Sequence, residues 1–117
     1  MFLLSLCEVD MGFTTGNFGA GTHFCGWFEA TRQQIEDAIG APTYLSHDPR
    51  EKTTIEWSMQ FDDGTVATIY DWKRFSKNEL RPDEVYRWHI GGTGLKSVKK
   101  VSQALGIPAT GTELVSY

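Results

Sequence analysis

Two runs of alternating apolar and polar residues predict a β-hairpin over residues 53–73. The runs are residues 53–61 and 65–73, and Asp62-Asp63-Gly64 separates them. Alternation with a period of two is typical of half-buried strands, and an Asp-Gly turn between such runs is a strong hairpin signal. A third run, residues 85–90, has the same character. The pattern therefore predicts an antiparallel sheet of three or more strands.

Two stretches, residues 31–39 and 94–105, have the spacing of short amphipathic helices. In the first, Thr31 and Gln34 have the spacing of a capping box, and Gly40 follows its last apolar residue. In the second, apolar side chains recur every three or four positions. We expect both helices to pack on one face of the sheet, which gives an α+β domain. The apolar positions of the second helix are Leu95, Val98, Val101 and Leu105.

A two-residue loop at Asp63-Gly64 would fix the register of the hairpin. Trp57 would then oppose Tyr70, and both would point into the core. A register shifted by one residue would exchange the faces of the strands. On the first register, the opposite, polar face carries Glu56, Asp71, Arg87 and His89.

The first 28 residues interleave glycine with aromatic side chains and fit no helical period. Glycine permits turns and aromatic rings require burial, so we expect residues 1–28 to wrap a surface or to enter an oligomer contact. The alternative is a mobile arm. A length of 117 residues fits one domain, residues 1–117.

Charge is distributed unevenly along the chain. Residues 1–70 carry three Lys or Arg against ten Asp or Glu, a net charge of −7, whereas residues 71–117 carry eight against five, a net charge of +3. This balance argues against long nucleic acid as a partner but allows a small anionic ligand at the basic end.

The composition also bounds the compartment. No apolar run approaches the ~20 residues that span a bilayer, so we expect no membrane partner. The two cysteines, Cys7 and Cys25, are too few for a disulfide scaffold and fit a reducing cytoplasm. We expect a cytoplasmic protein that needs no cofactor.

The glycine-rich stretch between the third strand and the second helix is the first candidate site. Backbone N–H groups at a helix N-terminus attract anions, and glycine lets a ligand approach closely. The stretch lacks the spacing of a P-loop or a dinucleotide fingerprint. The alternative is that the glycines only turn the chain and Thr93 caps the helix. The candidate residues are Gly91, Gly92, Thr93 and Lys96.

A group of aromatic and basic side chains on and beside the sheet is the second candidate. Flat rings could stack on a purine while guanidinium groups hold its phosphates. The alternative is that the rings are core residues, as aromatic residues in strands usually are. The candidate ligand-binding residues are Trp72, Arg74, Phe75, Arg87 and His89.

Metal binding and catalysis have weaker support in the sequence. Glu56, Asp71 and His89 offer the donor atoms of a metal site, but an ordinary solvated, salt-bridged face explains them better. His23 and Cys25, together with Cys7, lack the fourth ligand of a structural zinc site. We therefore predict neither a metal site nor a catalytic residue.

Two stretches, Ile69-Tyr-Asp-Trp-Lys73 and Trp88-His-Ile-Gly-Gly92, with Asp63-Gly64 before them, resemble small, mostly uncharacterised proteins of tailed bacteriophages. The resemblance covers residues 31–105. It implies a viral origin, and phage proteins of this size often act against host defence.

The resemblance leads us to expect a non-catalytic counter-defence protein that sequesters a nucleotide immune signal of the cyclic oligonucleotide or cyclic ADP-ribose type. Enclosing such a ligand between subunits favours a homo-oligomer. The first alternative is an inhibitor that binds a host defence protein, in the manner of anti-CRISPR proteins, through acidic residues of the first half. The second is an enzyme that degrades the same signal. The acidic residues are Glu8, Asp10, Glu36 and Asp37.

Overall fold

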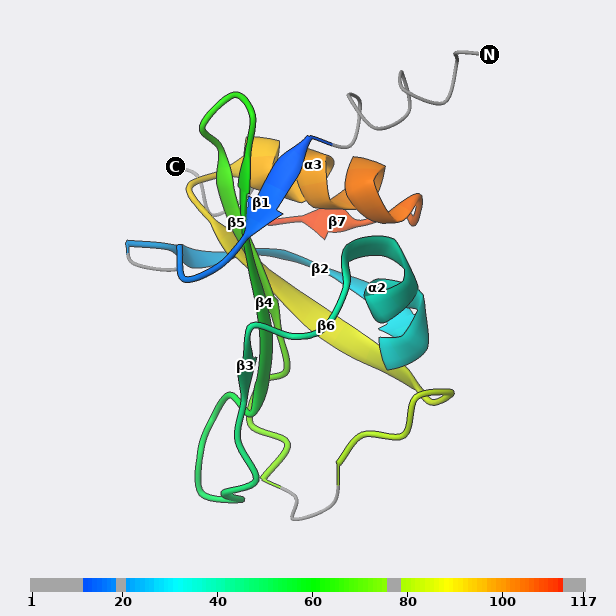
Figure 1. The fold of residues 1–117 in the computed structure, drawn as a ribbon. Coiled ribbons are helices and arrows are strands. Elements are labelled where there is room, and N and C mark those ends of the chain that lie inside the picture. Colours follow the sequence, from blue (N-terminus) through cyan, green and yellow to red (C-terminus); the bar gives the residue numbers. More distant parts are fainter. Residues whose placement is uncertain (1–11, 19–20, 76–78, 113–117) are drawn as a thin grey trace.

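The computed structural model describes residues 12–18, 21–75 and 79–112. These residues form a seven-stranded antiparallel sheet and two helices, which confirms the predicted α+β class. The strand order is β1-β4-β5-β6-β2-β7, and β3 pairs with β4 (Figure 1). The strands are β1 Phe13–Thr15, β2 His23–Thr31, β3 Tyr44–Leu45, β4 Ile55–Phe61, β5 Val66–Tyr70, β6 Val85–Gly92 and β7 Thr110–Gly111.

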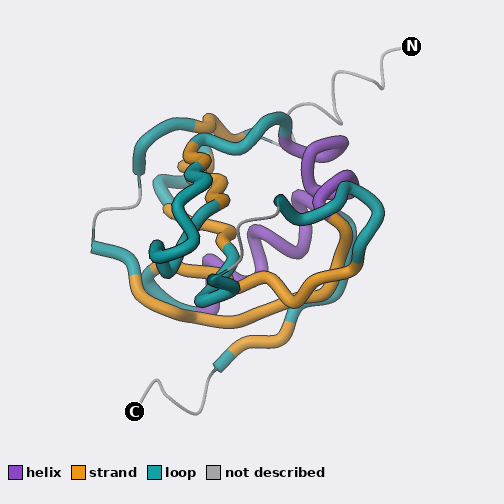
Figure 2. Tube along the Cα trace, turned by 90° about the horizontal axis from the view of Figure 1, so that it is seen from below, coloured by secondary structure: helices purple, strands orange, loops and turns teal. Residues whose placement is uncertain are grey.

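Helices α2 (Arg32–Ile39) and α3 (Leu95–Leu105) cover the same face of the sheet. Figure 2 shows the strands curving round the helices. The core between the layers contains Trp57 and Trp88, whose rings meet edge to face at 5.4 Å, and both indoles are fully buried. The Trp57 indole N–H also donates to the Gly40 carbonyl at 2.8 Å, which anchors the end of α2. The prediction that two helices pack on one face is confirmed.

The predicted capping box at the start of α2 is also confirmed. The Thr31 hydroxyl accepts a hydrogen bond from the Gln34 N–H at 3.1 Å, and the Gln34 side chain accepts one from the Thr31 N–H at 2.8 Å. These two bonds satisfy backbone donors that a helix start leaves without partners. Neither described helix is long and apolar enough to cross a membrane.

The predicted register of the hairpin is wrong by one residue. The turn has three residues, because the Phe61 N–H donates to the Thr65 carbonyl and Gly64 adopts a φ of 90°. A left-handed glycine at the end of a three-residue turn is a common hairpin geometry. In the observed register, Trp57 opposes Ile69 and Glu56 opposes Tyr70. Tyr70 is therefore on the face without helices, and Ile69 takes its place in the core.

Strand β2 corrects the prediction for residues 1–28. Its first six residues lie inside that segment, and the strand pairs along its length with β6. Phe28 and Ala30 are buried under the helices, while Trp27 and Glu29 alternate to the other face. Part of the glycine-aromatic segment is thus an interior strand of the sheet. Residues 1–11, 19 and 20 lie outside the described residues.

Strand β6 is two residues longer than predicted. It continues through Gly91 and Gly92, which pair with Phe24 and His23 of β2. The expected turn therefore begins only at Thr93, and α3 starts at Leu95 with Gly94 as its N-cap. Thr93 does not cap the helix.

Candidate functional site

Four ring side chains gather on the helix-free face of the sheet, and we call Phe24, Tyr70, Trp72 and His89 the ring cluster. His89 is at its centre, with ring centroids 4.6 Å from Phe24, 5.5 Å from Tyr70 and 6.2 Å from Trp72. The Trp72 and His89 rings are nearly parallel, at 23°. Burial lowers the pKa of His89, so its imidazole is uncharged at pH 7 and acts as a flat ring.

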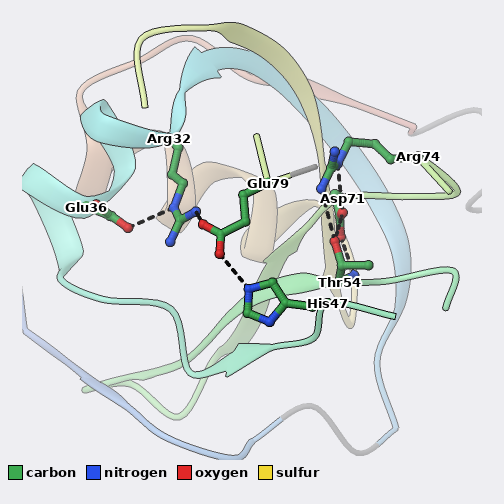
Figure 3. Close-up of polar contacts among 7 residues, drawn as sticks. All are labelled: Arg32, Glu36, His47, Thr54, Asp71, Arg74 and Glu79. Carbon is green, nitrogen blue, oxygen red and sulfur yellow. Dashed lines mark hydrogen bonds and ion pairs between the residues drawn. The ribbon is translucent and has the colours of Figure 1, made fainter. Parts of the chain in front are cut away.

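Asp71 fixes the chain at the end of β5. Its buried carboxylate accepts hydrogen bonds from the backbone N–H groups of Thr54 at 2.7 Å and Ile55 at 3.0 Å, and from the Thr54 hydroxyl. Arg74 pairs with the same carboxylate at 3.1 Å (Figure 3). A buried carboxylate needs such partners to offset its lost hydration. The network therefore holds the segment after β5 against the start of β4.

Trp72 leaves the strand ladder because the backbone beyond it turns into the left-handed region. Lys73 has a φ of 54° and Phe75 a φ of 47°. The Lys73 N–H donates to the Lys52 carbonyl at 2.7 Å, and the Trp72 N–H donates to the Tyr86 hydroxyl at 3.2 Å. Trp72 is thus held in place while 40% of its surface remains exposed. An exposed but positioned indole is suited to stacking.

A second polar network lies on the surface beside α2. Glu79 contacts the His47 Nε2 at 2.5 Å and the Arg32 guanidinium at 3.3 Å, and Arg32 also pairs with Glu36 (Figure 3). The hydrogen bond from His47, followed by that from Arg32, lowers the pKa of Glu79. These contacts connect α2, the loop after β3 and the loop before β6. The polar groups of His47 and Arg32 thus have partners within the chain.

A cavity of about 230 Å³ opens beside the ring cluster. Gly91 forms part of its wall, and a Cβ atom there would lie 2.5 Å from the Thr68 hydroxyl oxygen and 3.2 Å from the Tyr70 ring. Glycine at this position therefore lets Thr68 and Tyr70 close around the cavity. The lining residues are Thr22, His23, Thr53, Glu56, Thr68, Tyr70, Trp72 and Gly91.

A larger groove of about 1010 Å³ adjoins this cavity, and Thr53 and Glu56 line both. One wall is the segment after β1, where the Phe18 N–H donates to the Ser58 hydroxyl at 2.9 Å. The other wall carries Tyr44, Arg50, Glu51 and Lys52. Small-molecule sites commonly occupy about 300–1,000 Å³, so the open cavity and groove together have room for a ligand of nucleotide size.

Glu56 is the charged residue at the junction of cavity and groove. Among the described residues, its carboxylate makes no hydrogen bond or ion pair. Burial, followed by the nearby charge of Asp71, raises its pKa from the ordinary value of a glutamate. The groove therefore contains a half-buried acceptor that the described part of the protein leaves without a donor.

The structure brings three predicted ligand-binding residues together, since Trp72 and Gly91 line the cavity and His89 stacks beside it. Arg74 instead pairs with Asp71 inside the protein. Phe75 is 52% exposed but lines neither the cavity nor the groove.

Arg87 belongs to the same face but to its β2 side. Its guanidinium lies 3.9 Å from the centre of the Trp27 ring and pairs with Glu29 at 3.1 Å. Both contacts are cross-strand, because Glu29 opposes Arg87 in the ladder. Arg87 is therefore next to the ring cluster but does not line the cavity.

The glycine-rich candidate site is on the opposite side of the sheet. A Cβ atom at Gly92 would lie 2.2 Å from the Ser97 hydroxyl oxygen, so Gly92 serves the packing of α3. That hydroxyl accepts from the Thr93 N–H and donates to the Val66 carbonyl. Lys96 pairs with Asp63 at 3.2 Å, as Lys100 does at 3.3 Å. The polar groups here thus bind one another, and Gly91 alone joins the ring cluster.

The metal and thiol candidates change as well. The predicted register would have placed Glu56 opposite Asp71, but in the structure Glu56 is opposite Tyr70. The described residues contain no group of three His, Cys, Asp or Glu placed to hold a metal ion. The Cys25 thiol is buried and donates to the His23 carbonyl at 3.3 Å. Burial raises its pKa, so it is a protonated thiol at pH 7. Cys7 is outside the described residues.

Five residues of this site were not among the predicted ligand-binding residues, although Glu56 and His23 were considered as metal ligands. The correct hairpin register, readable from a three-residue turn ending in Gly64, would have placed Tyr70 beside His89. Thr68 and Glu56 are on the recognised hairpin, where the wrong register put Thr68 on the core face and Glu56 opposite Asp71. His23 and Phe24 carry no local signal, because β2 brings them in from a distant segment. The missed residues are Phe24, His23, Glu56, Thr68 and Tyr70. No protein-family model, curated protein or solved structure matches this chain, so its own geometry carries the functional argument.

Proposed function

We propose that this protein binds a small nucleotide on the helix-free face of its sheet and holds it without changing it chemically. The observation that carries the proposal is the ring cluster beside a cavity of about 230 Å³. Phe24 and Trp72 are each about 40% exposed although ring contacts position them. Exposed, oriented rings beside a cavity are the arrangement on which nucleobases stack.

The adjoining groove would take the sugar and phosphates. Lys52 lines it, and among the described residues its ammonium group has no hydrogen-bond or ion-pair partner. Arg50, whose side chain is 88% exposed, lines it as well and pairs with Asp48. Lys73 is close by, with its ammonium 5.6 Å from the centre of the Trp72 ring. These cations support binding of an anionic ligand whose base sits in the cavity.

The biological role in this proposal follows from the resemblance to phage proteins. The ligand is a nucleotide immune signal of the cyclic oligonucleotide or cyclic ADP-ribose type, and the protein sequesters it in the host cytoplasm. Sequestration requires high affinity without turnover, and a homo-oligomer would enclose the ligand further. Light scattering coupled to size-exclusion chromatography, with and without ligand, measures that assembly.

A thermal-shift screen tests the proposal. The purified protein is heated with cyclic dinucleotides, cyclic trinucleotides and cyclic ADP-ribose isomers, and each ligand is then recovered and weighed by mass spectrometry. At about 100 times Kd, a ligand that binds only the native state stabilises it by about 2.7 kcal/mol, a rise in Tm of roughly 11 °C. No rise with any ligand would overturn the proposal and favour the host-protein inhibitor. A rise with altered ligand would favour the enzyme.

Replacing Trp72 with alanine is expected to weaken binding of the stabilising ligand about 5- to 150-fold. Stacking of one base on one aromatic ring contributes about 1–3 kcal/mol. Isothermal titration measures the change, and Trp27→Ala is the matched control because Trp27 is on the same face but lines neither cavity nor groove. Equal loss in both variants, or none in Trp72→Ala, would contradict a ligand seated at the ring cluster.

A further inference from the structure

We infer that Glu56 selects a base with two neighbouring N–H donors, which is the chemistry of guanine. The inference rests on the proposed function and names the ligand class of the same site. Guanine offers its ring N1–H and its amino group side by side on one edge, and a carboxylate can accept from both. Adenine and hypoxanthine each lack one of these donors.

The position of Glu56 supports a role in base recognition. It is directly across the ladder from Tyr70, and it lines the cavity together with Trp72. A base stacked on the rings would bring its edge against the part of the cavity wall that Glu56 forms. Because Glu56 also lines the groove, it marks the point where the base ends and the sugar begins.

The chemical state of Glu56 supports the same role. A half-buried carboxylate without a donor is costly, and neither Arg50 nor Lys52, which line the same groove, pairs with Glu56. Arg74 pairs with Asp71, and Arg50 pairs with Asp48. Asp71 adds a second negative charge nearby. A phosphate at this position would be repelled, so the ligand group that meets Glu56 must be a hydrogen-bond donor.

A metal ion explains Glu56 less well. No group of three metal-binding side chains exists among the described residues, and a single carboxylate is a poor site. A base edge satisfies both oxygens and uses the adjacent rings as well. Charge-assisted bonds of this kind discriminate strongly, because a base that lacks the donor leaves the carboxylate without a partner.

The test compares cyclic di-GMP, cyclic di-IMP and cyclic di-AMP, which share a backbone and differ in the base edge. Isothermal titration with the wild-type protein is expected to show cyclic di-GMP binding at least about 10-fold more tightly than either of the others. Glu56→Gln, which retains one acceptor oxygen and adds a competing donor, is expected to weaken cyclic di-GMP about 10- to 100-fold. Glu29→Gln is the matched control, since Glu29 is on the same face outside the cavity, and its effect is expected to stay within about 2-fold.

Each outcome decides between the two proposals. Binding of cyclic di-AMP or a cyclic ADP-ribose isomer without binding of cyclic di-GMP would overturn the inference and leave the proposed function intact. Equal affinity for all three bases, or unchanged affinity in Glu56→Gln, would do the same. If no nucleotide binds, both the proposed nucleotide-binding function and the selection of guanine by Glu56 are wrong. The wild-type comparison decides the matter even if Glu56→Gln does not fold.

Discussion

Replacing Asp71 with alanine is expected to lower the free energy of unfolding by about 3–5 kcal/mol, the usual cost of removing one partner of a buried ion pair. The substitution leaves the Arg74 guanidinium, whose side chain is only 13% exposed, without this carboxylate. It also leaves the N–H groups of Thr54 and Ile55 without their acceptor. Equilibrium unfolding in urea, followed by circular dichroism, measures the loss.

The control for this prediction is Asp48→Ala. Asp48 also pairs with an arginine and accepts a backbone N–H, but its partner Arg50 is 88% exposed. Exposed pairs add little to stability, so the unfolding midpoint is expected to stay unchanged. Equal loss of unfolding free energy in the two variants would contradict the prediction that the buried Asp71 network stabilises the fold more than an exposed ion pair does. The same network positions Trp72, so Asp71→Ala is also expected to weaken ligand binding.

Replacing Ile69 with alanine is expected to destabilise the protein by about 2–5 kcal/mol, because Ile69 is fully buried between the sheet and the helices. Tyr70→Ala is expected to cost clearly less, because Tyr70 is half-buried on the other face, where its ring contacts the Trp72 and His89 rings and not the core. Urea unfolding of both variants measures the difference. The larger loss in Tyr70→Ala would mean that the register with a two-residue turn is correct.

The local signals in the sequence were sufficient for the hairpin and both helices. The capping box of Thr31 and Gln34, and the Asp-Gly turn, act over a few residues, so they can be read without knowledge of the fold. The length of the turn is less visible. Asp62 and Asp63 both suit turns, and the choice between two and three loop residues reverses the faces of one strand.

Strand β2 was missed because its alternation is hidden. A register shift between Phe24 and Gly26 interrupts it, and the core-facing positions include glycine and alanine. The face of β2 without helices carries Trp27, an apolar residue at a position where a half-buried strand usually has a polar one. A strand with rings on both faces and small residues in the core has no period of two in its hydrophobicity.

The sequence predicted the type of site, aromatic side chains beside polar groups on a sheet, but not all of the residues that form it. Trp72 and His89 belong to strands that were recognised, and aromatic side chains near a strand end are a visible signal. Glu56 is on a recognised strand and on the predicted polar face, but the wrong register separated it from Tyr70. Phe24 joins them only through the pairing of β2 with the distant β6, which no local pattern encodes. Arg74 shows the converse case, because a basic residue beside an aromatic one is here committed to a buried carboxylate.

The uneven burial of the four tryptophans makes the protein its own optical reporter. Trp57 and Trp88 are fully buried and Trp27 is half-buried beneath Arg87, whereas Trp72 is 40% exposed. The red edge of the intrinsic fluorescence therefore comes mainly from Trp72. A base stacking on this indole is expected to quench that emission and shift the remainder toward shorter wavelength, and Trp72→Phe is expected to abolish the response. Binding can thus be followed by titration without a label.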